Sequence, residues 1–166
     1  MLGAMDVLWA AWRNEYITGE APTTDGCLFC HLPGEDDAEA LIVERGDSAY
    51  TVLNLYPYSP GHLVVTPYRH VANIAGLTPD EAADSWRLLA RAEQALTAAM
   101  SPGGFNMGIN LGQVAGAGIP EHIHIHLVPR WSGDTNFMSA TARTRVLPED
   151  LTLTREKLLE ALSDRR

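Results

Sequence analysis

Three histidines alternate with apolar residues in one short run of the chain, His122-Ile123-His124-Ile125-His126-Leu127-Val128. Side chains in a β-strand point to opposite faces at successive residues, so a strand here would carry all three imidazoles on one face. Because the chain has only 6 histidines among 166 residues, this spacing arises by chance roughly 0.01 times. The run therefore predicts a strand with one buried apolar face and one functional histidine face. A half-exposed strand that is merely rich in histidine is the alternative.

Four more strand-like runs precede the histidines, separated by turns rich in Gly, Pro and Asp: residues 40–44, 49–54, 62–67 and 105–110. Residues 7–17 read as a short helix or arm that carries Trp9 and Trp12. A final short helix is expected at residues 149–162.

One long helix has a clear start signal. Thr78 can cap it, Pro79 suits the first helical position, and Glu81 completes a capping box. The helix should end near Met100, before a Ser-Pro-Gly-Gly stretch. Its packed side is expected at Trp86, Leu89, Ala92 or Glu93, Leu96 and Met100. Consecutive strands with one long helix and a short C-terminal helix predict an α+β fold with an antiparallel sheet.

The charge of the chain limits its partners. A formal charge of −9 argues against binding to nucleic acid or to an acidic membrane surface. The first 16 residues lack the basic start of a secretory signal, and no apolar run reaches transmembrane length. We therefore expect a cytoplasmic protein with reduced cysteines at Cys27 and Cys30.

A glycine-rich loop, Asn110 to Gly118, leads into the histidine run. Its three glycines allow the backbone to approach a ligand closely and to aim N–H groups at it, which binds phosphate without basic side chains. A plain turn is the alternative. Beside this loop a neutral histidine could act as a nucleophile at phosphorus. Metal binding is the other use of such imidazoles, and an outer histidine could bind a metal while the central one stays free.

The spacing of Cys27 and Cys30 suits a tetrahedral zinc ion, although two ligands alone are ambiguous. Buried reduced thiols and a redox pair are the alternatives. His31 directly follows Cys30 and is one candidate for a further ligand.

Together these motifs resemble the histidine triad (HIT) family. The run from His122 to Val128 matches the family pattern His-φ-His-φ-His-φ-φ, where φ is apolar. Asn54, with Gly61-His62 and the strand after it, is similar to the nucleotide-side strands of the family. Residues 106–118 are similar to its phosphate loop. Residues 52–62 and 129–134 are most similar to the branch that contains actinobacterial diadenosine tetraphosphate phosphorylases.

The resemblance implies one HIT domain over residues 1–166, with an N-terminal arm at 1–24, a core at 25–135 and a C-terminal extension at 136–166. It also implies a homodimer that binds a nucleotide, with inorganic phosphate or water as the second substrate.

The roles of the site residues follow from the same resemblance. His124 would attack the α-phosphorus and form a nucleotidyl-histidine, and His126 and His62 would support it. Asn54 would contact the ribose. The phosphoryl oxygens would be held by Asn110 and by the amides of Gly116, Ala117 and Gly118. Trp131 would stack on adenine or pack at the dimer interface. Arg69 and Arg130 would contact phosphate or simply be solvated.

The resemblance further implies a structural zinc ion held by Cys27, Cys30, His70 and His122. Phosphate as the acceptor would make the protein a phosphorylase that converts diadenosine tetraphosphate to ADP and ATP. Water would make it a hydrolase of dinucleoside polyphosphates or of nucleoside phosphoramidates. A zinc-stabilised nucleotide-binding module is the alternative of another class.

The loop before the histidines departs from the family pattern. Many hydrolases of the family carry Ala-Gly-Gln there, and the phosphorylase branch carries a small residue with a hydroxyl. This chain has Gly116-Ala117-Gly118. This difference bears on whether phosphate or water is the acceptor, and it does not bear on the prediction that His124 is the nucleophile.

Overall fold

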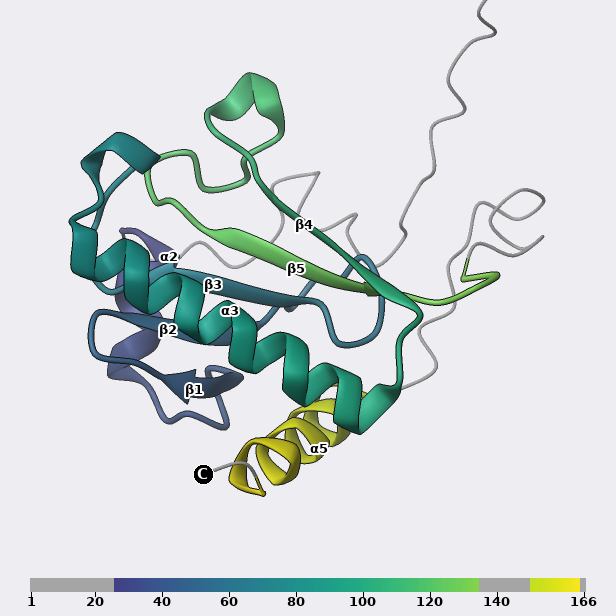
Figure 1. Ribbon diagram of the computed structural model, residues 1–166. Coiled ribbons are helices and arrows are strands. Elements are labelled where there is room, and N and C mark those ends of the chain that lie inside the picture. The colour runs from purple at the N-terminus through teal and green to yellow at the C-terminus, as the bar shows by residue number, and fades with distance from the viewer. Residues whose placement is uncertain (1–25, 135–149, 165–166) are drawn as a thin grey trace, which may run out of the picture.

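A computed structural model describes residues 26–134 and 150–164, so the predictions for residues 7–17, for the N-terminal arm and for residues 136–149 lie outside the described residues. Five antiparallel strands form one sheet in the order β1-β2-β3-β5-β4 (Figure 1). The strands are β1 Ile42–Arg45, β2 Ala49–Leu53, β3 Leu63–Pro67, β4 Gly104–Ile109 and β5 Ile125–Arg130. The predicted α+β class is confirmed.

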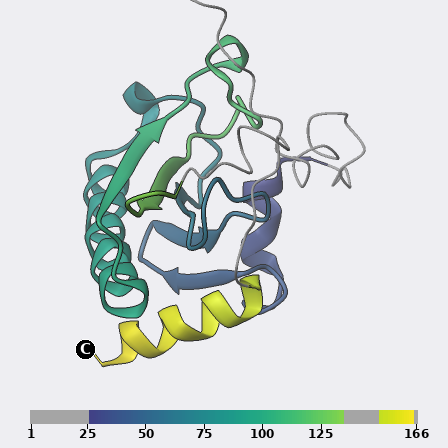
Figure 2. The ribbon, with the colours of Figure 1, turned by 90° about the vertical axis from the view of Figure 1, so that its right-hand side faces the viewer.

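In the described part of the chain, the α-helices that accompany the sheet are α2 Leu28–His31, α3 Pro79–Met100 and α5 Leu151–Ser163. Single turns of 3₁₀-helix lie at Leu32–Gly34 (η2), Ile74–Gly76 (η3) and Gln113–Ala115 (η4). Helix α3 lies along one face of the sheet and α2 lies on the other, as the turned view shows (Figure 2). Asp150 caps the start of α5, because its carboxylate accepts a hydrogen bond from the Thr152 amide, and the helix packs against α3 and β1.

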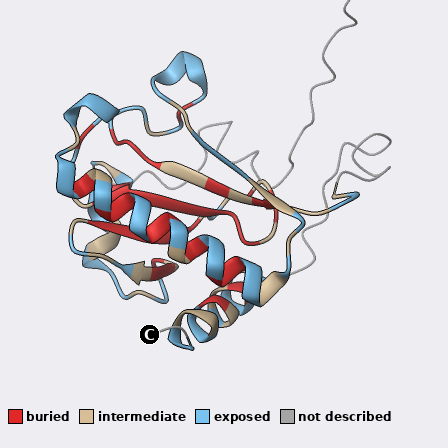
Figure 3. Cartoon of the chain, viewed as in Figure 1, coloured by how far each residue is buried: buried red, intermediate tan, exposed pale blue. Residues whose placement is uncertain are grey.

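Helix α3 begins as the sequence predicts. The Thr78 hydroxyl accepts a hydrogen bond from the Glu81 amide, and the Glu81 carboxylate accepts one from the Thr78 amide. The main core lies between this helix and the sheet, where the buried side of α3 is visible in Figure 3. The helix buries Leu88, Leu89, Ala92, Ala95 and Leu96.

The expected packed side of α3 was wrong at Trp86, which is 59% exposed. At 100° per residue, Trp86 lies well over 90° around the helix from the line through Leu88, Ala92 and Leu96. Spacing alone could place Trp86 in a stripe with Leu89, whereas the sheet packs against a line centred near Ala92.

A second, smaller core covers the opposite face of the sheet under α2. Its buried members are Phe29, Ala40, Ile42, Tyr50, Val52 and Val64. One row of paired residues runs across the sheet on this face: Ile42, Val52, Val64, His126 and Gly108. Directly paired residues share a face, so the histidine face of β5 continues the face of the second core.

The histidine run is less regular than predicted, because strand β5 begins only at Ile125. Pro67 ends the neighbouring strand and has no N–H to donate. The Thr66 hydroxyl donates to the Ile123 carbonyl at 2.9 Å instead, and the Ile123 amide donates to the Val71 carbonyl at 2.7 Å. His122 and His124 are therefore positioned by these bonds and lie just before the strand.

Candidate functional site

Three imidazoles that the sequence singled out lie in one cluster. The ring centroids of His124 and His126 are 4.9 Å apart, and those of His62 and His126 are 5.2 Å apart. His62 Nε2 lies 3.0 Å from His126 Nδ1. The cluster joins β5 to the end of the turn before β3, because His62 directly precedes that strand.

The hydrogen bonds determine which nitrogen of each ring carries the proton in the His62–His126 pair. The Tyr58 amide donates to His62 Nδ1 at 3.1 Å, so the proton of a neutral His62 is on Nε2. His62 Nε2 then donates to His126 Nδ1. A neutral His126 must consequently carry its own proton on Nε2, which makes that nitrogen a donor suited to a phosphoryl oxygen. The Tyr58 ring stacks on His62 with centroids 4.9 Å apart and supports this arrangement.

His124 is held differently. Its Nδ1 donates to the His122 carbonyl at 2.8 Å, and no described residue makes a hydrogen bond to its Nε2. Burial lowers the pKa of His124 below its usual value and outweighs the opposing effect of the carbonyl. The ring is therefore neutral near pH 7 with a lone pair on Nε2, which is the form that a nucleophile needs.

An open depression of about 410 Å³ lies over β4 and β5 on the histidine face. Its lining is Tyr58, Asn106, Met107, Gly108, Asn110, His126, Val128 and Arg130. Gly108 is paired directly with His126, and a Cβ placed on Gly108 would meet nothing within 4 Å. The absence of a side chain at Gly108 thus keeps the surface beside His126 open.

Of the two asparagines predicted to bind substrate, one lines this depression and the other does not. Asn110 lines it, and its amide donates to the Gly116 carbonyl at 3.4 Å. Asn54 is outside the lining, and its Oδ1 accepts a hydrogen bond from the Tyr56 amide at 2.9 Å. The amides of Gly116 and Ala117 donate within the loop, to Gln113 and Gly112, and Gly116 has a φ of +89°. Gly118 is exposed.

Trp131 and Arg130 lie at the far end of β5. The Trp131 indole donates to the Met100 carbonyl at the end of α3, 3.3 Å away. Trp131 also lines a second depression of about 420 Å³ with Gly103, Gly104, Phe105, Asn106, Arg130 and Ser132. Arg130 pairs with Asp134 and donates to Asn106 at 2.6 Å. Its charge is therefore already compensated within the protein.

The four predicted metal ligands come together. The ligand atoms of Cys27, Cys30, His70 and His122 all lie within 4.8 Å of one another. Three sulfur–nitrogen distances are 3.2, 3.3 and 3.5 Å. Ligands of a tetrahedral zinc ion lie about 3.5 Å apart, so these residues fit such an ion. Burial, followed by the neighbouring Cys27 sulfur, raises the pKa of Cys30 in the absence of a cation, and a bound dication would favour the thiolate.

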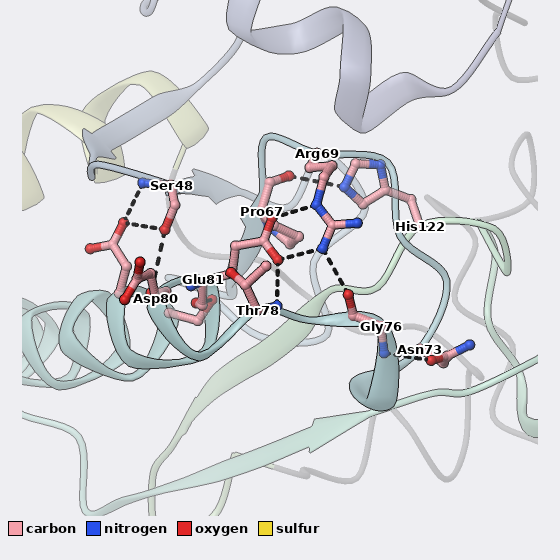
Figure 4. A network of polar contacts seen from close by, with 11 residues as sticks. Ser48, Pro67, Arg69, Asn73, Gly76, Thr78, Asp80, Glu81 and His122 are labelled. Atoms are coloured by element: carbon pink, nitrogen blue, oxygen red, sulfur yellow. Dashed lines mark hydrogen bonds and ion pairs between the residues drawn. The ribbon is translucent and has the colours of Figure 1, made fainter.

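The surroundings of the metal group orient its histidines. His122 Nε2 donates to the Pro67 carbonyl at 2.9 Å (Figure 4). This leaves the lone pair of His122 Nδ1 for the two sulfurs, which lie 3.2 and 3.5 Å from it. Arg69, next to His70, forms two hydrogen bonds to the buried Glu81 and one to the Gly76 carbonyl (Figure 4). His31, the alternative ligand, pairs with Glu35 at 2.9 Å and is not part of the group.

Comparison with known proteins places this geometry in a family. The model of the HIT domain matches residues 35–133. The chain belongs to the histidine triad family. AP-4-A phosphorylase of Mycobacterium tuberculosis is 41% identical over 159 residues, which cover 91% of this chain and 81% of that protein. The asymmetrical bis(5'-nucleosyl)-tetraphosphatase of Schizosaccharomyces pombe is 37% identical over 82 residues, covering 49% of this chain and 44% of that protein.

A solved HIT structure shows the same fold. The crystal structure of a Zn-bound histidine triad family protein from Mycobacterium smegmatis superposes with a TM-score of 0.68 at 27% identity. The match covers 84% of this chain and 94% of that one. Within residues 26–134 and 150–164, no helix is both long and apolar enough to cross a membrane.

Two contributors to the HIT site escaped the sequence analysis. Phe29 contacts both His122 and His124, and Glu81 anchors the residue beside His70. The position of Phe29 between the two cysteines was an available signal. Glu81 was identified only as part of a helix cap, and nothing in its local sequence indicates that it also binds Arg69.

Proposed function

We propose that this HIT protein is a nucleotidyl transferase that splits dinucleoside polyphosphates, with diadenosine tetraphosphate and inorganic phosphate as its substrates. The observation that carries the proposal is the state of His124. Its Nδ1 is held by the His122 carbonyl, and its Nε2 has no hydrogen bond from the described residues. The similarity to the M. tuberculosis AP-4-A phosphorylase over 91% of the chain supports the choice of substrate.

The reaction would proceed in two steps. His124 Nε2 attacks the α-phosphorus, a P–N bond forms, and the bond to the β-phosphate oxygen breaks and releases ATP. The protonated Nε2 of His126 donates toward the phosphoryl oxygens and stabilises the negative charge that grows on them. A phosphate oxygen then attacks the same phosphorus, the P–N bond breaks, and ADP leaves. His124 thereby returns to its neutral form, with the proton on Nδ1 and a lone pair on Nε2.

Binding would use the depression over β4 and β5. We assign Asn110 and the loop amide of Gly118 to the phosphoryl oxygens, and Asn54 to the ribose. The amides of Gly116 and Ala117 would join them only if the loop opened, because they donate within it. Trp131 is assigned to the adenine from its place in the second depression.

Hydrolysis is the second candidate function. The local similarity to a tetraphosphatase favours it. The triplet Gly116-Ala117-Gly118 favours neither acceptor, because it lacks both the hydroxyl of the phosphorylase branch and the Ala-Gly-Gln of many hydrolases.

Incubation with diadenosine tetraphosphate, with and without inorganic phosphate, separates the functions. ADP plus ATP formed only with phosphate supports phosphorolysis, and AMP plus ATP formed in either condition supports hydrolysis. Binding without products would overturn the enzymatic proposal in favour of a nucleotide-binding module. Radiolabelled phosphate recovered in ADP would identify the acceptor directly.

We further propose that Cys27, Cys30, His70 and His122 hold a structural zinc ion. Protein ligands would occupy all four coordination positions of a tetrahedral ion, so the metal would bind the α2 turn to the sheet and have a structural role. Metal analysis of protein never exposed to chelators should give about one zinc per chain. Less than half an equivalent would contradict the assignment.

A homodimer in the cytoplasm completes the proposal. Strand β4 is one of the two outer strands of the described sheet and carries the exposed Met107. Such an edge favours pairing with another chain. Sedimentation should give twice the mass of one chain, and a monomer at micromolar concentration would exclude the dimer.

A further inference from the structure

Phe29 lies between the two cysteines of the metal group and contacts two histidines with different roles. Its ring centroid is 4.9 Å from that of His124, with the planes inclined by 41°. The centroid of the His122 ring is 5.5 Å away, at 67°. Phe29 is 7% exposed, so these contacts lie within the second core.

Hydrogen bonds also hold the backbone of Phe29 and of the turn around it. The buried Tyr50 hydroxyl donates to the Phe29 carbonyl at 2.7 Å, and the Tyr50 ring stacks on Tyr68 with centroids 5.3 Å apart. The Cys27 carbonyl accepts hydrogen bonds from the Cys30 and His31 amides, which closes the turn around Phe29. The position of the ring therefore depends on the geometry of the turn that carries both thiols.

The hydrogen bond to the His122 carbonyl does not by itself determine the plane of the His124 ring. A single hydrogen bond at Nδ1 allows the ring to tilt about its direction, whereas a packed aromatic face restricts that tilt. Attack in line with a leaving group requires the lone pair of Nε2 to be aimed within narrow limits. Phe29 and His126 both have ring centroids 4.9 Å from that of His124, and of the two Phe29 is the one that belongs to the metal-binding turn.

We propose that Phe29 is a positioning residue, which transmits the geometry of the metal-binding turn to the nucleophile His124. The inference rests on the proposed function, in which His124 attacks phosphorus and the cysteine turn holds zinc. Metal at the turn would then improve catalysis without touching substrate.

The test compares Phe29→Met, which nearly keeps the volume but removes the flat ring, with Ile42→Val in the same core. Ile42 belongs to β1, which β2 and β3 separate from β5. We expect Phe29→Met to lower kcat about tenfold with KM within about twofold, and to retain one zinc per chain. Ile42→Val should lose comparable stability and keep kcat.

A spectroscopic arm reports on His124 without turnover. Nitrogen-15 NMR of the ring, assigned with His124→Ala, should show the Nδ1–H form in the wild type. Phe29→Met should broaden that signal, and so should zinc removal from the wild type. Ile42→Val should leave it unchanged.

The outcomes keep this inference distinct from the proposed function. A wild type that produces no nucleotides from diadenosine tetraphosphate refutes the function itself. An active wild type whose Phe29→Met variant keeps more than half of kcat and an unchanged ring signal refutes the role of Phe29 alone. Loss of zinc from Phe29→Met would also overturn it, because Phe29 would then only support the turn.

Discussion

His124 differs from its neighbours in what its ring nitrogens contact. His122 directs both nitrogens to fixed partners, the cysteine sulfurs and the Pro67 carbonyl. The pair of His62 and His126 shares a hydrogen bond. Among the described residues, by contrast, His124 is hydrogen-bonded through Nδ1 alone. One sequence pattern thus places three imidazoles in three different surroundings, which is why we propose a different role for each of them.

Replacement of His124 by alanine should abolish turnover and leave the fold intact. The ring is a nucleophile in our proposal, and removal of a nucleophile typically costs several orders of magnitude in kcat. Initial rates of diadenosine tetraphosphate cleavage check the loss, and circular dichroism checks the fold. His31→Ala is the matched control, since His31 pairs with Glu35 outside the site and should retain full activity. Activity of His124→Ala above a tenth of wild type would refute the assignment.

The link between β3 and α3 supplies one of the four residues of the metal group. It carries His70, and Arg69 ties it to Glu81 in the first turn of α3 (Figure 4). Glu81 therefore acts twice, as the acidic half of the capping box and as the partner of Arg69. The side chain of Glu81 is 8% exposed, while that of Arg69 is 50% exposed. Glu81 should accordingly matter more to stability than a surface ion pair does.

Glu81→Gln should lower the free energy of unfolding by about 1–2 kcal/mol at neutral pH. The change removes charged hydrogen bonds from a buried acceptor, and solvent around Arg69 limits the loss. Urea titration with the zinc-loaded protein measures it. Glu93→Gln, on the exposed side of the same helix, should change stability by less than about 0.5 kcal/mol. Equal effects of the two substitutions would contradict the dual role of Glu81.

The same carboxylate predicts a pH dependence. The hydrogen bond from Arg69, followed by that from the Thr78 amide, lowers the pKa of Glu81 to about 2 from the usual 4.5. Because the folded value is depressed, the contribution of Glu81 is complete above about pH 4.5 and is lost as the pH falls toward 2. The stability difference between wild type and Glu81→Gln should therefore shrink across that interval. A stability difference that does not change with pH would show that the folded protein does not stabilise the charged form of Glu81.

At the scale of the whole molecule, an acidic protein is expected to bind a polyanion. The formal charge of −9 repels diadenosine tetraphosphate, and Arg69 and Arg130 are both paired with carboxylates. Recognition must therefore rely on amides, asparagines and imidazoles at short range. Added salt screens the repulsion between enzyme and substrate.

We therefore expect kcat/KM for diadenosine tetraphosphate to stay constant or to rise by up to about twofold as KCl increases from about 20 to 200 mM. Initial rates at low substrate concentration measure this dependence. Adenosine, which carries no charge and has no phosphate to be cleaved, serves as a competitor whose inhibition constant should be insensitive to salt. A steep fall of kcat/KM with salt would mean that a local positive field dominates.

Patterns of neighbouring residues were sufficient for much of the fold. The capping box at Thr78 and Glu81 is confirmed, and the four strands before the histidine run lie within two residues of their predicted positions. Both features depend on interactions across a few residues, which spacing and residue type encode directly. The alternation of histidines likewise placed the imidazoles on a common face.

Contacts between distant segments decided the rest. Cys27 and His122 are 95 positions apart, yet their ligand atoms lie at 3.2 Å. Pro67 interrupts the pairing with β3 that would have extended β5. Glu81 accepts hydrogen bonds from Arg69, and Phe29 packs on His124. Such contacts arise only when the sheet brings its strands together, because the free energy of each contact depends on partners that local sequence does not specify. The sequence alone therefore identified the candidate residues, and tertiary packing decides which partners each of them contacts.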